Sequence, residues 1–137
     1  MKKKLFFSVV FFTALVFFAC KKDKVTPRLD LLTGHIWVAD SLLADGVDQG
    51  GPGGILERFN GDTKFNTDGT GYVGSIAGTW EFSSNEELII ITSDSLPIPV
   101  TTRVVELSTK SLKLTTTYPL PVYPVQFMDV RMTFKPK

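Results

Sequence analysis

The chain has little of the residue types from which most catalytic and metal sites are built. Its 137 residues include one cysteine, Cys20, and one histidine, His35. A single cysteine cannot form a disulfide within the chain, and zinc sites take three or four protein ligands. No Gly-x-Ser-x-Gly elbow accompanies His35. We therefore predict no catalytic residues, no metal site and no cofactor, and interpret His35 as a surface or packing residue.

The chain also lacks an excess of either positive or negative charge. Fifteen basic residues stand against fourteen acidic ones, and the formal net charge is +1. The first 19 residues hold three lysines and no acid, so the remaining 118 residues carry a net charge of −2. A near-neutral chain lacks the broad basic field of nucleic-acid-binding proteins. We expect no nucleic-acid partner and one small domain.

The N-terminus holds the only long apolar run of the chain. Lys2 to Lys4 precede the run from Leu5 to Ala19, and Cys20 follows it directly. A charged start, an apolar middle and a small residue at the cut are the order of a secretory signal peptide. The run is shorter than the roughly 20 apolar residues that a membrane-spanning helix needs.

The end of this run resembles the lipobox of bacterial lipoproteins, in which the cysteine becomes the lipidated first residue. Ala19 and Cys20 match the lipobox, whereas Phe17 and Phe18 depart from its usual pattern. The resemblance implies a membrane anchor through lipid on Cys20, and several acyl chains hold a protein durably on a bilayer. A lone cysteine in a secreted chain is otherwise difficult to explain.

Three regions follow: a lipoprotein signal peptide at residues 1–19, a lipidated tether at 20–30 and a domain at 31–137. Lys21 and Lys22 stand where an aspartate would retain such a lipoprotein in the inner membrane of many Gram-negative bacteria. We therefore expect a lipid-anchored protein of the cell envelope, located at the outer membrane. The run Lys21–Lys24 resembles the charged tags of some surface-displayed Bacteroidetes lipoproteins, although it holds one acid only.

Beyond the tether, valine, isoleucine, threonine and phenylalanine alternate with polar residues, and turn residues recur every eight to twelve positions or so, which is typical of a sandwich or barrel. A brief helical turn at Leu29–Thr33 should end at Gly34. The expected strands are His35–Leu43, Ile55–Asn66, Thr70–Ser75, Gly78–Phe82, Leu88–Thr92, Val100–Leu107, Ser111–Thr117 and Val125–Lys135. Eight strands with hairpin-length links favour an all-β, antiparallel, up-and-down barrel.

The links between these strands are of two kinds. Residues 67–69, 83–87 and 108–110 are tight polar turns, whereas residues 45–54, 94–99 and 118–124 are long and rich in Gly or Pro. Strict up-and-down alternation sends the three long links to one end of the barrel. A barrel with loops at one end holds small ligands there.

Alternation along two strands predicts which side chains face inward. Met128, Val130, Met132 and Phe134 share one face of the last strand. Arg103 shares a face with Val105 and Leu107 and points inward if they do. In the competing register Val100 and Val104 point inward with Glu106, and Arg103 lies in water. An unpaired buried arginine is costly, and both registers stay open at this point.

The segment LLTGHIWVADSLLADG, with Gly34 followed by Trp37, resembles the opening of the lipocalin-like domains of Bacteroidetes lipoproteins. The segments FNTDGTG, GTWEF, ELIII and VVELSTKSLKLT continue the pattern in order, with Gly78 and Trp80 inside GTWEF. The resemblance implies a lipocalin-like barrel in which these glycines and tryptophans are structural, and an apolar ligand.

Two functions remain in view. The first is a lipoprotein that binds a small apolar or amphipathic molecule at its looped end, with Tyr118, Tyr123 and Arg103 as ligand-binding residues. The second is a non-enzymatic adhesion or assembly module with a filled barrel, whose contact surface includes the same tyrosines and the Pro-rich loops. Neither names a protein partner.

The anchor gives a direct prediction. Replacing Cys20 by serine removes the only thiol that can be lipidated, so Cys20→Ser should yield an unlipidated protein that the lipoprotein peptidase leaves mostly uncleaved. Metabolic labelling of cells with a clickable fatty acid measures this. Equal label on the wild type and the variant would contradict the prediction.

Overall fold

The computed structural model describes residues 27–137, so the predicted signal peptide, Cys20 and residues 21–26 lie outside the described residues. In the described part no helix has the length and hydropathy to cross a membrane. The elements are α1 (Pro27–Thr33), β1 (Ile36–Ala44), β2 (Val47–Asp48), the 3-10 turn η1 (Glu57–Phe59), β3 (Asp62–Phe65), β4 (Thr70–Val73), β5 (Ile76–Phe82), β6 (Leu88–Thr92), β7 (Val100–Leu107), β8 (Leu112–Leu120) and β9 (Gln126–Pro136).

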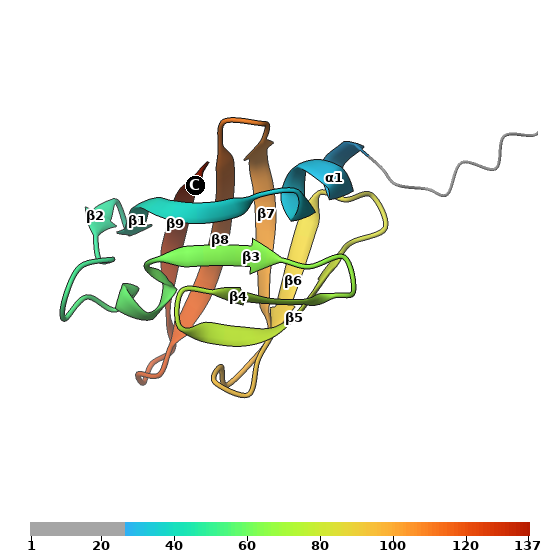
Figure 1. Cartoon of the computed structure of the whole chain (residues 1–137). Helices are drawn as coiled ribbons and strands as arrows, with labels where there is room; N and C mark the ends of the chain where they lie inside the picture. Colours follow the sequence, from blue (N-terminus) through green and yellow to red (C-terminus); the bar gives the residue numbers. More distant parts are fainter. Residues whose placement is uncertain (1–26) are drawn as a thin grey trace, which may run out of the picture.

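The strands form one closed antiparallel barrel. From β3 to β9 each strand pairs with the next along the chain, and β1 closes the barrel by pairing with both β3 and β9. The short β2 pairs only with the end of β1, outside the eight-stranded cycle. Figure 1 shows β3, β4 and β5 crossing in front of β7, β8 and β9. The predicted all-β, eight-stranded, up-and-down lipocalin-like barrel is confirmed.

Two strand boundaries differ from the prediction by three residues or more, and the others differ by one or two at most. The expected strand Ile55–Asn66 is wrong in its first half, because η1 and Gly61, which has a φ of +110°, turn the chain before β3 begins at Asp62. At the other boundary β8 continues through Pro119 to Leu120, which shortens the last loop. Pro119 pairs with β9 alone, and proline is tolerated at such an edge.

Helix α1 closes one end of the barrel. It begins at Pro27, two residues before the predicted turn, so residues 27–30 of the expected tether are helical. Leu32 is fully buried, and its carbonyl accepts a hydrogen bond from the indole nitrogen of Trp37 at 3.0 Å. Gly34 follows the helix as predicted: its amide donates to the Asp30 carbonyl, and a Cβ there would lie 2.6 Å from that oxygen.

The two tryptophans pack inside the barrel, which agrees with the structural role that the resemblance implies for them. Trp37 is fully buried and Trp80 is 9% exposed. The Trp80 ring makes edge-to-face contacts with Phe65 and Phe82, and its indole nitrogen donates to the Asn66 carbonyl at 2.9 Å. A Cβ at Gly78 would lie 2.1 Å from the carbonyl oxygen of Thr92, so the adjoining strand requires glycine there.

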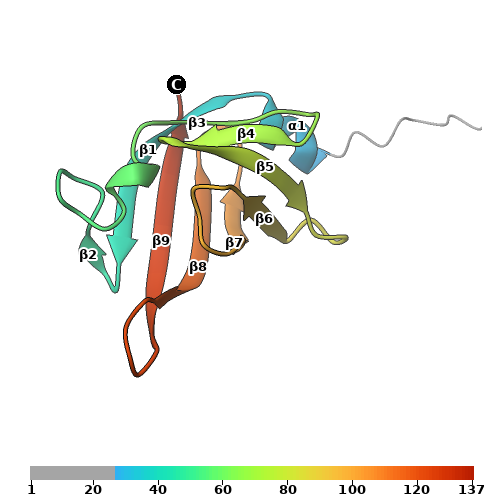
Figure 2. The ribbon, with the colours of Figure 1, turned by 90° about the horizontal axis from the view of Figure 1, so that it is seen from below.

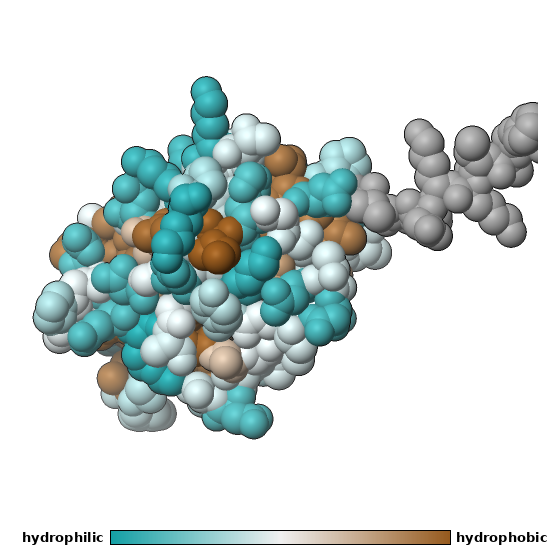
Figure 3. All heavy atoms as spheres, in the orientation of Figure 1, coloured by the Kyte–Doolittle hydropathy of each residue, from teal (hydrophilic) through white to brown (hydrophobic). Residues whose placement is uncertain are grey.

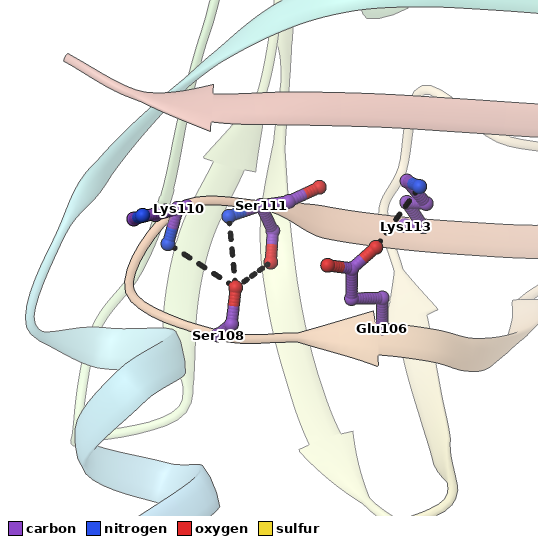
Figure 4. Close-up of polar contacts among 5 residues, drawn as sticks. All are labelled: Glu106, Ser108, Lys110, Ser111 and Lys113. Carbon is purple, nitrogen blue, oxygen red and sulfur yellow. Dashed lines mark hydrogen bonds and ion pairs between the residues drawn. The ribbon is translucent and has the colours of Figure 1, made fainter.

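Polar side chains in the tight turns form hydrogen bonds within those turns. In the β7–β8 turn the Ser108 hydroxyl oxygen accepts hydrogen bonds from the amides of Lys110 and Ser111, and Glu106 pairs with Lys113 just before the turn (Figure 4). In the β3–β4 turn the Asp68 carboxylate accepts hydrogen bonds from the hydroxyl and amide of Thr70, which hold the pKa of Asp68 below its usual value. These contacts fix the register of both hairpins.

The burial of Trp80 gives a stability prediction. Trp80→Ala removes a buried ring and leaves a cavity, which typically costs about 3–5 kcal/mol. Chemical denaturation of the two proteins measures the difference. Tyr123→Ala is the matched control, because Tyr123 is 99% exposed and its removal should leave the midpoint unchanged. Equal midpoints for the Trp80 variant and the wild type would contradict the packing described above.

Candidate functional site: the mouth of the barrel

The long links lie together at one end of the barrel, here called the mouth. Because every neighbouring strand is antiparallel, alternate links must emerge at the same end. The mouth therefore carries the links of residues 45–61, 74–75, 93–99 and 121–125, while α1 and the three tight turns lie at the closed end. Figures 1 and 2 show α1 at the end of the molecule away from the β8–β9 loop.

A cavity of about 210 Å³ opens at the mouth. Its floor is the inward face of β9, where the predicted apolar row is confirmed: Met128, Val130, Met132 and Phe134 are all buried. Two links and the ends of two further strands form its walls. The lining residues are Ile55, Leu56, Arg58, Phe59, Leu96, Pro97, Val100, Thr116, Tyr118, Met128, Val130 and Met132.

The remainder of the barrel is filled by its own side chains. Trp37, Phe65 and Phe134 are each at most 1% exposed and belong to one continuous core cluster. The cavity is therefore confined to the mouth. Its volume lies below the range of about 300–1,000 Å³ that is common for sites of drug-sized ligands.

Arg58 is the one charged side chain among the residues that line the cavity. It is the middle residue of η1, and its two terminal nitrogens lie 3.3 and 3.4 Å from the Ser95 carbonyl oxygen. This contact ties the 45–61 link to the 93–99 link across the mouth. Sequence reasoning missed Arg58 because it placed this residue in a strand; the glycines at 50, 51, 53, 54 and 61 were the indication that the link is longer.

Of the three predicted ligand-binding residues, the structure places one at the cavity. Tyr118 lines it, on the inward face of β8. Tyr123 is 99% exposed in the β8–β9 loop and does not line the cavity. Arg103 is also exposed, on the outer face of β7. The structure therefore brings neither Tyr123 nor Arg103 to the mouth.

The inward orientation considered for Arg103 is wrong, and a bulge explains the misleading pattern. Val100, Thr102 and Val104 point inward, and the pairing with β8 then shifts between Val104 and Glu106. A bulge adds one residue and reverses the alternation that follows. Leu107 therefore points inward like Val104, although the two residues are three positions apart and would face opposite sides of a regular strand. Glu106 lies on the outside and pairs with Lys113.

The lining of the mouth is mainly apolar. Its walls are aliphatic and aromatic, its polar groups are the Arg58 guanidinium, the Tyr118 hydroxyl and the Thr116 hydroxyl, and none of its lining residues is an acid, histidine or cysteine. The Thr116 hydroxyl donates to the Thr101 carbonyl at 2.7 Å, so it is already engaged. An apolar pocket with a few polar groups at its rim orients an amphipathic molecule.

Comparison with known proteins finds no family model that matches the chain and no curated protein that matches it. The class of the protein is therefore defined by its fold, an eight-stranded antiparallel barrel of lipocalin-like architecture. The family suggested by the sequence segments stays a prediction.

Proposed function

We propose that the protein is a lipid-anchored lipoprotein of the cell envelope, related to the lipocalin-like Bacteroidetes lipoproteins, whose barrel binds a small amphipathic molecule at its mouth. The observation that carries the binding proposal is the cavity over the apolar row of β9, with Arg58 at its rim. The anchor rests on the sequence around Cys20.

The cavity limits the size and chemistry of the ligand. A volume of about 210 Å³ is below the roughly 300–1,000 Å³ common for drug-sized ligands. A medium-length aliphatic chain suits such a small apolar space. A guanidinium pairs in a bidentate manner with a carboxylate, so Arg58 favours an acid group at the polar end. A medium-chain carboxylic acid meets both requirements.

The anchor and the mouth lie at opposite ends of the domain in this proposal. Pro27, the first residue of α1, comes seven residues after Cys20, and seven residues span at most about 25 Å when fully extended. Because α1 packs at the closed end, this short connection keeps the closed end nearest the membrane. The mouth then opens toward the aqueous phase, from which the ligand enters.

A specific observation also favours the second function, an adhesion or assembly module. The β8–β9 hairpin exposes several apolar side chains beyond the barrel, which include Val122 at 47%, Tyr123 at 99%, Val125 at 61% and Phe127 at 66% exposed. The face in Figure 3 mixes hydrophilic and intermediate residues with separate hydrophobic patches. Exposed apolar residues grouped in this way mark contact surfaces, and Tyr123 keeps its predicted role in this function only.

Calorimetric titration of octanoate into the protein lacking residues 1–20, in detergent-free buffer, tests the binding proposal. Saturable binding of one octanoate is expected. Arg58→Ala removes the partner of the carboxylate and should weaken octanoate about tenfold or more, since hydrogen bonds to charged groups contribute about 1.5–3 kcal/mol. Octanol should bind the variant and the wild type equally.

Two further variants of this protein test whether octanoate binds at the mouth. Lys110→Ala removes an exposed cation from the tight β7–β8 turn at the closed end and should leave octanoate affinity unchanged. Leu96→Trp narrows the cavity from the 93–99 link and should weaken octanoate and octanol alike. If neither molecule binds the wild type, the ligand-binding function is wrong and the assembly module becomes the better account.

A further inference from the structure

The outer wall of the barrel carries a second concave surface, which shares only Thr116 and Val130 with the cavity at the mouth. It is a depression of about 440 Å³ over β7, β8 and β9, and its lining includes Arg103, Thr115 and Arg131. The three residues lie in one row across the sheet, because Arg103 pairs with Thr115 and Thr115 pairs with Arg131. Neighbouring strands are about 4.8 Å apart, so each arginine is one strand from the threonine between them.

These two arginines have no partner among residues 27–137. The other two arginines of the described part each donate to a backbone carbonyl, Arg28 to Glu86 and Arg58 to Ser95. The three ion pairs of the described part use lysines instead, one of them Lys113 on the same outer face. Lys113 thus has an acidic partner, whereas the two arginines on either side of Thr115 have none within the described residues.

The other groups around the depression are hydroxyls and one acid. Thr101 and Thr117 lie one row nearer the mouth, and the Thr117 hydroxyl is 3.2 Å from the Asp129 carboxylate. The side-chain hydroxyls of Thr101 and Thr115 form no hydrogen bond within the described residues and can donate to a bound group. One acid against two arginines leaves the depression with net positive charge.

We propose that this depression binds a phosphate group, with Arg103 and Arg131 on either side and the Thr115 hydroxyl beneath it. A terminal phosphate carries a charge of about −1.5 to −2 and three strong acceptor oxygens. Two guanidinium forks and one hydroxyl offer the matching donors. The group is shared by the free phosphate ion and by phosphate esters such as lipid headgroups.

The site does not depend on the function proposed for the mouth. Thr116 and Val130 line both hollows, but Arg103, Thr115 and Arg131, which make the proposed phosphate contacts, line the outer depression alone. A variant of one site can therefore fail without affecting the other.

Calorimetry of the full-length chain in non-ionic detergent, at constant ionic strength with chloride, tests the proposal. Inorganic phosphate should bind saturably, and R103Q and R131Q should each weaken it about tenfold or more, because each loses a charge-assisted hydrogen bond. D129N removes the one acid at the depression and should strengthen binding. K110Q, which removes an exposed cation outside the depression, is the control and should bind phosphate like the wild type.

Glycerol 3-phosphate in place of inorganic phosphate distinguishes the two sources. Tighter binding of the ester assigns the site to a phosphate headgroup, and equal or weaker binding assigns it to the free ion. All four substituted residues are exposed, so thermal midpoints should stay at the wild-type value and exclude unfolding as the cause. The absence of saturable binding, or equal affinity of R103Q, R131Q and K110Q, overturns the proposal.

Discussion

The pairing of β1 with two strands at once is the constraint on which the barrel depends. Its first three residues pair with β3, and nearly its whole length pairs with β9. Beyond the pair of Val38 with Asp62, the edge of β1 that faces β3 would be open. An open edge invites pairing with other chains. Two nearby segments cover this edge. The short β2 pairs with the end of β1, and the Gly61 carbonyl accepts a hydrogen bond from the Ala39 amide.

The path of the chain across this opening also builds the mouth. Residues 45–61 must travel from the end of β1 back to β3, and on the way they bury Leu56 to 3% exposure and direct Arg58 to Ser95. The closed end needs no such detour, because α1 buries Leu32 against the Trp37 ring. The difference between a sealed end and a hollowed end therefore follows from how β1 is flanked.

Regular alternation is the part of the structure that the sequence predicts well. Met128 to Phe134 alternate without interruption, and β9 buries every one of them on one face. The bulge in β7 could not be predicted from the sequence. Because of the extra residue, the apolar residues of β7 fit two registers equally well, and one of them wrongly places Arg103 inside the barrel. Arg58 was missed for a related reason: a run of apolar and charged residues matches a strand, and only packing against the mouth turns it into η1.

We propose above all that an amphipathic acid occupies the mouth, with its chain on β9 and its carboxylate at Arg58. A crystal structure of the protein with octanoate brominated at its terminal carbon tests this most directly, since anomalous scattering locates the bromine. We expect one bromine peak against Met128 and Val130, with carboxylate density at the Arg58 guanidinium. A mouth without a bromine peak, in crystals whose bromine lies only elsewhere on the barrel, would contradict the account.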